Sequence, residues 1–162
     1  MTDFLLFDEE FHLIKDVISR LKTDAQAKVV FIVDKNGQQI AAQGDLESLD
    51  TTSLASLTAG NVAATDGLAK LIGEREFPVL FHEGERDNVY IAIVGQRVIL
   101  VVIFDEHSSL GLVRLRVRKA TQDLEKIFVT IQKKIETEKD RKDLDSPFAE
   151  ITDEDIDSLF RE

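Results

Sequence analysis

The sequence predicts an α+β fold, in which a single antiparallel sheet of five strands carries helices on both faces. Two segments rich in β-branched residues come first, three more follow a long helical segment, and amphipathic helices flank the series. The connections between them are short, which favours antiparallel pairing of neighbouring strands. The expected order is therefore helix, two strands, helix, three strands, helix.

A first helix is expected over residues 8–24 and a β-hairpin directly after it. Apolar residues recur in the helix at steps of three and four, at Phe11, Ile14, Ile18 and Leu21. The hairpin strands are expected at 28–34 and 38–42, because the intervening Asn36-Gly37 pair readily adopts the left-handed conformations of a tight turn.

The central helix is expected over residues 50–73, with its N-cap at Asp50, Thr51 or Thr52. We expect both of two opposite faces to be covered. One face has the larger side chains of an ordinary core stripe: Leu54, Leu57, Ala64, Leu68, Leu71 and Ile72. The other face has small residues. Each glycine there costs the helix roughly 1 kcal/mol relative to alanine, so we expect a compensating contact, the close approach of another backbone. These residues are Ser56, Ala59, Gly60, Ala63 and Gly67.

Three further strands are expected at 77–82, 88–94 and 97–105. The run 97–104 is almost continuously apolar, which predicts a central strand with both faces covered. The strand that starts at Phe77 is expected at an edge of the sheet, because Pro78 has no N–H to donate to a neighbouring strand.

A long last helix is expected from Ser108, and the chain changes character beyond Ile135. Its apolar face comprises Val113, Val117, Ala120, Leu124, Ile127, Phe128, Ile131 and Ile135. We expect a domain at 1–136, a charged flexible linker at 137–147 and a C-terminal peptide at 148–162. Thr152 with an acidic residue three positions later indicates a short helix in this peptide. A helix this short needs a groove, either on a second protein or on its own domain. The residues expected to dock are Phe148, Ile151, Ile156, Leu159 and Phe160.

Composition narrows the class of protein. The 162 residues are 43% hydrophobic, enough for one domain with a core, and no cysteine is present. We therefore expect no disulfide or thiolate site, and a cytoplasmic location. No secretory signal or apolar run of membrane-spanning length is visible, so membrane insertion is not expected. The net charge of −11 argues against nucleic acid as a partner, although the net +5 over residues 114–142 could attract an acidic protein surface.

No catalytic, cofactor or metal site is predicted. His12, His82 and His107 fall on separate elements, without a second ligand at metal-binding spacing or a neighbouring nucleophile. The glycines of the central segment lack the Gly-Lys-Ser/Thr ending of a phosphate loop. The residues therefore indicate a binding or regulatory protein without its own active site.

Five segments resemble the roadblock family of dynein light-chain-like domains, in particular bacterial members that regulate a Ras-like polarity GTPase. These segments are residues 28–38, 50–74, 77–84, 101–120 and 146–160. The resemblance implies a homodimer joined through edge strands and central helices. It also implies activation of a small GTPase of the MglA type in cell polarity and gliding motility, with action at a cell pole. The C-terminal helix would aid binding or nucleotide exchange.

The same resemblance assigns expected contact residues. The dimer interface would include Ser56, Gly60, Phe77, Val79 and Phe81. The GTPase would contact Ala59, Ala63, Gly67, Lys70, Lys119 and Lys126. Two alternatives remain open at this point: a scaffold of roadblock type that changes no GTPase rate, and a small-molecule sensor or enzyme on the same sheet.

Overall fold

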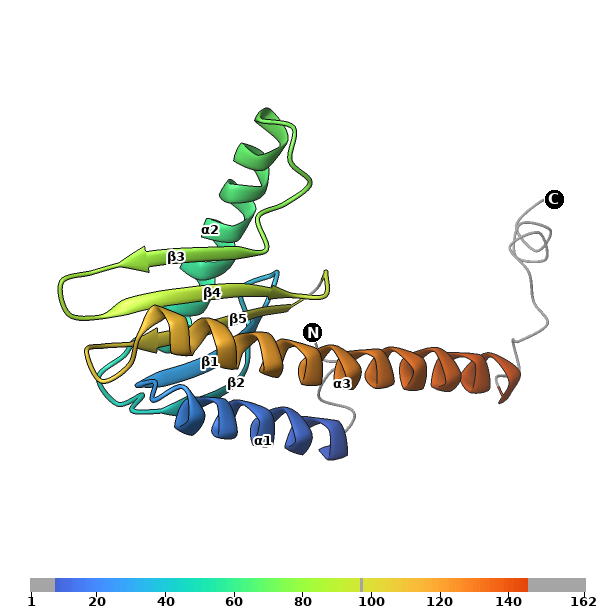
Figure 1. Ribbon diagram of the computed structural model, residues 1–162. Helices are drawn as coiled ribbons and strands as arrows, with labels where there is room; N and C mark the ends of the chain where they lie inside the picture. Colours follow the sequence, from blue (N-terminus) through green and yellow to red (C-terminus); the bar gives the residue numbers. More distant parts are fainter. Residues whose placement is uncertain (1–7, 97, 146–162) are drawn as a thin grey trace. The chain divides into compact units, whose positions relative to one another are not determined.

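The computed structural model describes residues 8–96 and 98–145 and has the element order that the sequence predicts (Figure 1). The helices are α1 (Asp8–Asp24), α2 (Thr51–Leu71) and α3 (Leu110–Asp145). The strands are β1 (Val29–Asp34), β2 (Gln39–Gly44), β3 (Val79–Glu83), β4 (Asn88–Val94) and β5 (Val98–Phe104). The α+β class and the five-stranded antiparallel sheet are thereby confirmed.

The strand order is β2-β1-β5-β4-β3, so β5 is central and β3 lies at an edge, as predicted. Every residue of β5 and of β1 is buried, because helices cover both faces of the sheet there. The hairpin turn between β1 and β2 places Gly37 at a φ of 89°. The Asp34 carboxylate accepts hydrogen bonds from the backbone N–H groups of Asn36 and Gln38, at 2.9 and 3.0 Å, and so stabilises this turn.

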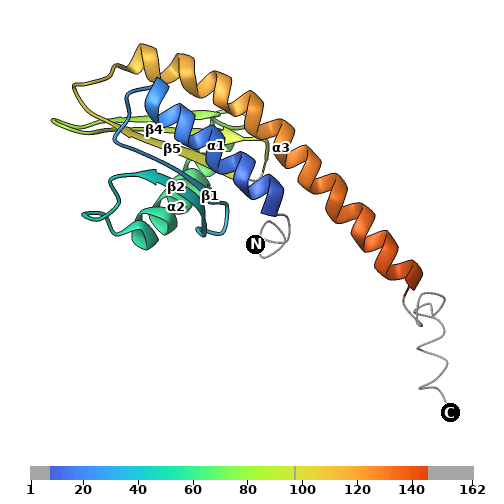
Figure 2. The same cartoon turned by 90° about the horizontal axis from the view of Figure 1, so that it is seen from below.

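Helices α1 and α3 cover one face of the sheet, and α2 covers the other (Figure 2). The predicted core residues of α1 and of the first part of α3 are buried: Ile14, Ile18, Leu21, Val113, Val117, Ala120, Leu124 and Ile127. The chain divides into two compact units, the first ending at Phe128 and the second starting at Val129. Helix α3 continues to Asp145, so residues 137–145 are helical and the flexible linker expected there is wrong for these residues. Their Glu, Lys and Arg side chains are good helix formers, which explains the longer helix.

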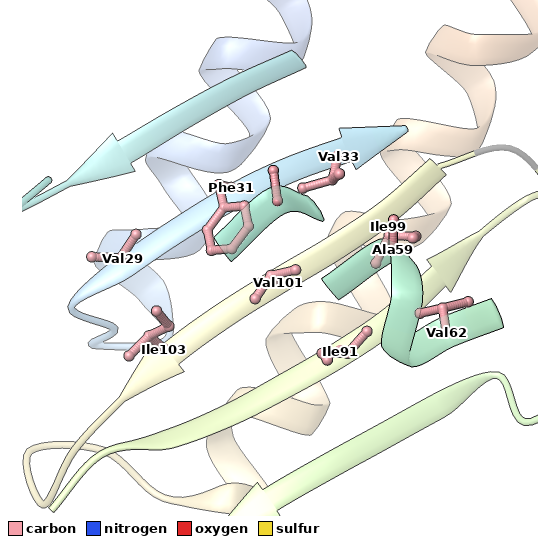
Figure 3. Close-up of a cluster of buried hydrophobic side chains, with 10 residues drawn as sticks. Val29, Phe31, Val33, Ala59, Val62, Ile91, Ile99, Val101 and Ile103 are labelled. Carbon is pink, nitrogen blue, oxygen red and sulfur yellow. The ribbon is translucent and has the colours of Figure 1, made fainter. Parts of the chain in front are cut away.

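The core contact of α2 differs from the prediction. Residues Ala55, Ala59 and Val62 pack against the sheet, opposite large side chains of β1, β4 and β5 (Figure 3). Those side chains include Phe31, Ile91, Ile99 and Val101. Because the sheet supplies the bulk, small residues on the helix let the two layers approach closely.

Most of the predicted core stripe of α2 is therefore exposed. Leu57 is 71% exposed, Leu68 55%, Leu71 84% and Ile72 63%, whereas Leu54 alone of the stripe packs against the core cluster. Ala64 is exposed as well. The stripe prediction was wrong because it ranked residues by hydrophobicity and did not consider which of them fit against a bulky sheet.

The start of α2 gives a prediction about acid stability. The Ser53 hydroxyl and backbone N–H donate to the Asp50 carboxylate at 2.6 and 3.1 Å, and these bonds lower the pKa of Asp50 below its ordinary value of 3.8. Stability from this cap is present above the ordinary pKa and is lost as the pH falls through the lowered folded value. Asp50→Ala should lower the melting temperature at pH 7 by a few degrees. Asp50→Ser should restore most of that loss and remove this part of the acid dependence, as followed by circular dichroism.

The control for this experiment is Asp45→Ser, which changes an exposed carboxylate outside the helix. It should retain the wild-type melting profile between pH 2 and pH 7. An equal loss in Asp45→Ser and Asp50→Ala would contradict a specific role for the cap.

Candidate protein-binding site

The side of α2 that points away from the sheet is an exposed surface of small and apolar residues. We call it the outer α2 surface, and its members are Ser56, Leu57, Gly60, Ala63, Ala64, Gly67, Leu68 and Leu71. At 100° per residue these side chains share one side of the helix, and they unite most of both predicted stripes. A contiguous apolar surface of this kind is typical of a protein-binding site.

The two glycines of this surface do not pack against any of the residues that the structure describes. A Cβ atom added at Gly60 or at Gly67 would meet no heavy atom within 4 Å. Glycine in these places weakens the helix by roughly 1 kcal/mol relative to alanine. The open space above both residues therefore suits the close approach of another chain.

The edge strand β3 lies beside this helix. The side chains of Asn61 in α2 and His82 in β3 form a hydrogen bond of 3.0 Å. The C-terminal half of α2 extends past β3 in Figure 1, which explains why Leu68 and Leu71 are uncovered. Among the strands that the structure describes, none lies beside the outer edge of β3, so its backbone groups can pair with a strand of another chain.

Exposed apolar side chains also lie along β3. Val79 is 40% exposed and Phe81 is 36% exposed, while Phe77 is half-buried just before the strand. The Phe81 ring stacks on Phe104, with ring centroids 6.1 Å apart, which holds it in place on the sheet.

The structure brings some of the predicted contact residues together and separates others. Ala63, Gly67 and Lys70 are exposed along α2, and their contact with a GTPase stays a prediction. Ala59 is only 8% exposed and belongs to the core, so its predicted role as a GTPase contact is wrong. Lys119 and Lys126 lie on α3, which covers the opposite face of the sheet, so they do not extend the outer α2 surface.

Sequence reasoning missed Leu57, Leu68 and Leu71 as members of the candidate surface, because it assigned them to the core. The signal that could have found them is the spacing of Ala55, Ala59 and Val62, a helical stripe that leaves the leucines on another side. The residues of the C-terminal peptide, Phe148, Ile151, Ile156, Leu159 and Phe160, lie outside the described residues.

Asp105 and His107 form a local polar pair at the end of β5. His107 Nδ1 lies 2.9 Å from Asp105 Oδ1, and this hydrogen bond raises the pKa of His107. Hydrogen bonds from the backbone N–H and the ring of His107 lower the pKa of Asp105. Within residues 8–96 and 98–145, no group of three or more His, Asp or Glu residues could hold a metal ion. None of the helices in this part of the chain combines the length and apolar character needed to cross a bilayer.

The family model and the similar solved structures agree on one protein family. The Roadblock/LC7 domain model matches residues 13–104. The solved structure of Myxococcus xanthus MglB has a sequence 63% identical to this chain and superposes with a TM-score of 0.75. The match covers 77% of this chain and 94% of that one. The gliding protein MglB of Thermus thermophilus is 33% identical, with a TM-score of 0.69, over 73% and 90%.

A further MglB structure, described as having a tetrameric arrangement, is 31% identical, with a TM-score of 0.72, over 75% of this chain and 92% of that one. No curated protein sequence matches. A Roadblock/LC7 domain of Streptomyces avermitilis, 12% identical with a TM-score of 0.63, shares the fold.

Proposed function

This chain belongs to the Roadblock/LC7 family, and we propose that it is a homodimeric regulator that binds a Ras-like small GTPase of the MglA type and accelerates its hydrolysis of GTP. The observation that carries the proposal is the outer α2 surface, which is exposed, rich in glycine and alanine, and next to an unpaired edge strand. The 63% identity to Myxococcus MglB over most of both chains supports placing that surface in this functional context.

The proposed dimer contact uses the edge of the sheet and the beginning of the outer α2 surface. Two β3 strands can pair antiparallel across a two-fold axis, since each offers a row of free backbone groups. Val79 and Phe81 would be covered by the partner, with Phe77 at the margin. Ser56 and Gly60 leave room for the second α2 helix.

The GTPase would lie across the later part of the same helices. Ala63 and Gly67 allow a close approach, and the exposed Lys70 can pair with an acidic side chain at the margin. Leu68 and Leu71 supply the apolar area whose burial stabilises the complex, at about 25 cal/mol per Å² removed from water. Lys119 and Lys126 lie on the other face of the sheet, so we propose them, with the C-terminal peptide, as a second contact region for the GTPase, the peptide also aiding nucleotide exchange.

The proposed mechanism needs no catalytic group from this chain. Hydrolysis of GTP requires one side chain that orients the attacking water and another that neutralises charge at the γ-phosphate. A GTPase can supply both side chains itself when its loops are held in place. A rigid helical surface pressed against those loops would stabilise the active arrangement. Regulation of polarity and gliding at a cell pole would follow from this activity.

The experiment that tests the proposal measures phosphate release by the MglA-type GTPase of the same organism, with and without this protein. We expect the hydrolysis rate to rise at least tenfold at saturating regulator, because the loops that orient water and catalytic side chains become ordered. Binding of the GTP-loaded GTPase without any rise in rate would reject the activating role and leave the scaffold function. Absence of binding would reject both.

A second prediction concerns the glycines of the outer α2 surface. Gly67→Ala should raise the free energy of unfolding of the subunit by roughly 0.5–1 kcal/mol, because alanine is the better helix former and its methyl group meets no atom of the subunit. The same change should weaken binding of the GTPase, measured by titration calorimetry. Gly111→Ala is the control, since a Cβ there also meets no atom and the residue lies in α3. Greater stability with unchanged binding in Gly67→Ala would show that no partner backbone approaches there.

A further inference from the structure

A groove of about 370 Å³ lies on the face of the sheet opposite α2, between α3 and the strands β3 and β4. Its apolar lining includes Val79, which is 40% exposed, above Tyr90, Ala92 and Val117, which are each at most 4% exposed. Tyr90 and Ala92 alternate along β4 with Ile91, which faces α2, so the groove and the outer α2 surface are on different sides of the sheet. A ligand in the groove would therefore leave the outer α2 surface free.

Two arginines at one end of the groove form no ion pair with the residues that the structure describes. Arg114 and Arg118 are one helical turn apart on α3, are exposed, and line the groove. No ion pair joins either of them to a carboxylate in the part of the chain that the structure describes. Residues 110–128 hold five basic and two acidic side chains in a chain of net charge −11. This end of the groove is therefore a positive site on an otherwise acidic protein.

The opposite end of the groove is negative. Glu125 also lines it and follows Arg118 by seven residues, which corresponds to about 10 Å along the helix axis. An extended peptide covers this distance with about three residues at roughly 3.3 Å each. The groove thus has a charge order along its length, with arginines, an apolar floor and then a carboxylate.

We propose that this groove binds an extended segment of a partner protein in which a carboxylate, two or three apolar residues and a cationic residue follow one another. The carboxylate pairs with Arg114 and Arg118, whose guanidinium groups suit bidentate bonds to carboxylates. The apolar side chains lie along the lining of the groove at Val79, where the groove borders the proposed dimer contact, and the cation reaches Glu125. A membrane surface fits less well, because it is flat and anionic while the apolar floor is recessed and one end of the groove is acidic.

The probe for this site is a fluorescein-labelled peptide with the sequence Asp-Asp-Leu-Phe-Leu-Lys, flanked by glycines and capped at both ends. We expect saturable binding to the full chain by fluorescence anisotropy. The double variant Arg114→Ala with Arg118→Ala should weaken binding at least tenfold, and so should a peptide with Asn in place of both Asp residues. Arg116→Ala is the matched control, because this exposed arginine does not line the groove, and it should change the affinity less than twofold.

The exchange of charge provides a second test that does not depend on loss of binding. Arg114→Glu with Arg118→Glu should reject the acidic peptide and bind the version with Lys in place of both Asp residues. The proposal is overturned if the acidic peptide does not bind, or if Arg116→Ala and the groove variants lose affinity equally. It is also overturned if phosphatidylglycerol vesicles bind with the same dependence on Arg114 and Arg118 while the peptide does not. Self-association with that dependence, again without peptide binding, would assign the groove to a second copy of the chain.

Discussion

Arginine at positions 63 and 67 together is expected to abolish stimulation of the GTPase while the protein stays folded. Ala63 and Gly67 are exposed on the outer α2 surface, and a Cβ at Gly67 meets no atom of the subunit. Two long cationic side chains there would hold any partner away from the helix. The subunit itself should not suffer, because arginine is a better helix former than glycine.

The measurement for Ala63→Arg with Gly67→Arg is phosphate release at saturating regulator, together with a thermal melt. We expect the rate to fall to that of the GTPase alone and the melting curve to remain cooperative. Leu115→Arg is the control, because Leu115 is 59% exposed on α3, across the sheet from α2. Full stimulation by the double variant would contradict the assignment of this surface to the GTPase.

Arginine at position 59 is expected to have the opposite effect, unfolding the subunit. Ala59 lies four residues before Ala63 on the same helix but is only 8% exposed, in contact with the core cluster of the sheet. A guanidinium there would be buried without a partner, at a cost of about 3–5 kcal/mol. Since domains of this size are stable by about 5–15 kcal/mol, most of the stability would be lost.

Urea denaturation followed by circular dichroism measures this effect. Ala59→Arg should unfold at a much lower urea concentration than the wild type, whereas the single variant Ala63→Arg should unfold near the wild-type midpoint. Because the two variants introduce the same residue into the same helix, their difference reports which side of α2 faces the sheet. Equal midpoints would contradict the packing of α2 described above.

The elements of this fold could be predicted from the sequence because their signals are local. The apolar residues of α1 recur at steps of three and four, and those of β5 follow one another without interruption, so each signal is read within its own short segment. The hairpin turn depends on the Asn36-Gly37 pair alone. The end of α3 was harder, because charged residues that form helices well are also typical of flexible linkers.

The outer α2 surface could be predicted only in part. Gly60 and Gly67 stood out by their cost to a helix and Ala63 by its small size, and the structure leaves all three exposed. The neighbouring leucines were assigned to the core because hydrophobicity ranks them above alanine. Which of these residues is buried depends on the shape of the layer opposite, and that layer comes from strands up to 50 residues away in the sequence.

The sequence by itself determined the order of helices and strands, the central place of β5, the edge position of β3 and the resemblance to the roadblock family. Each of these follows from periodicity, turn residues or motifs that are read along the chain. Only the tertiary structure decided that Ala55, Ala59 and Val62 face the sheet, and that the leucines of α2 face outward. It also decided that Arg114, Arg118 and Glu125 border an apolar groove with β3 and β4. The physical reason is that close packing selects side chains by their fit to a neighbouring layer, and the sequence of α2 alone does not say which of its two stripes fits that layer.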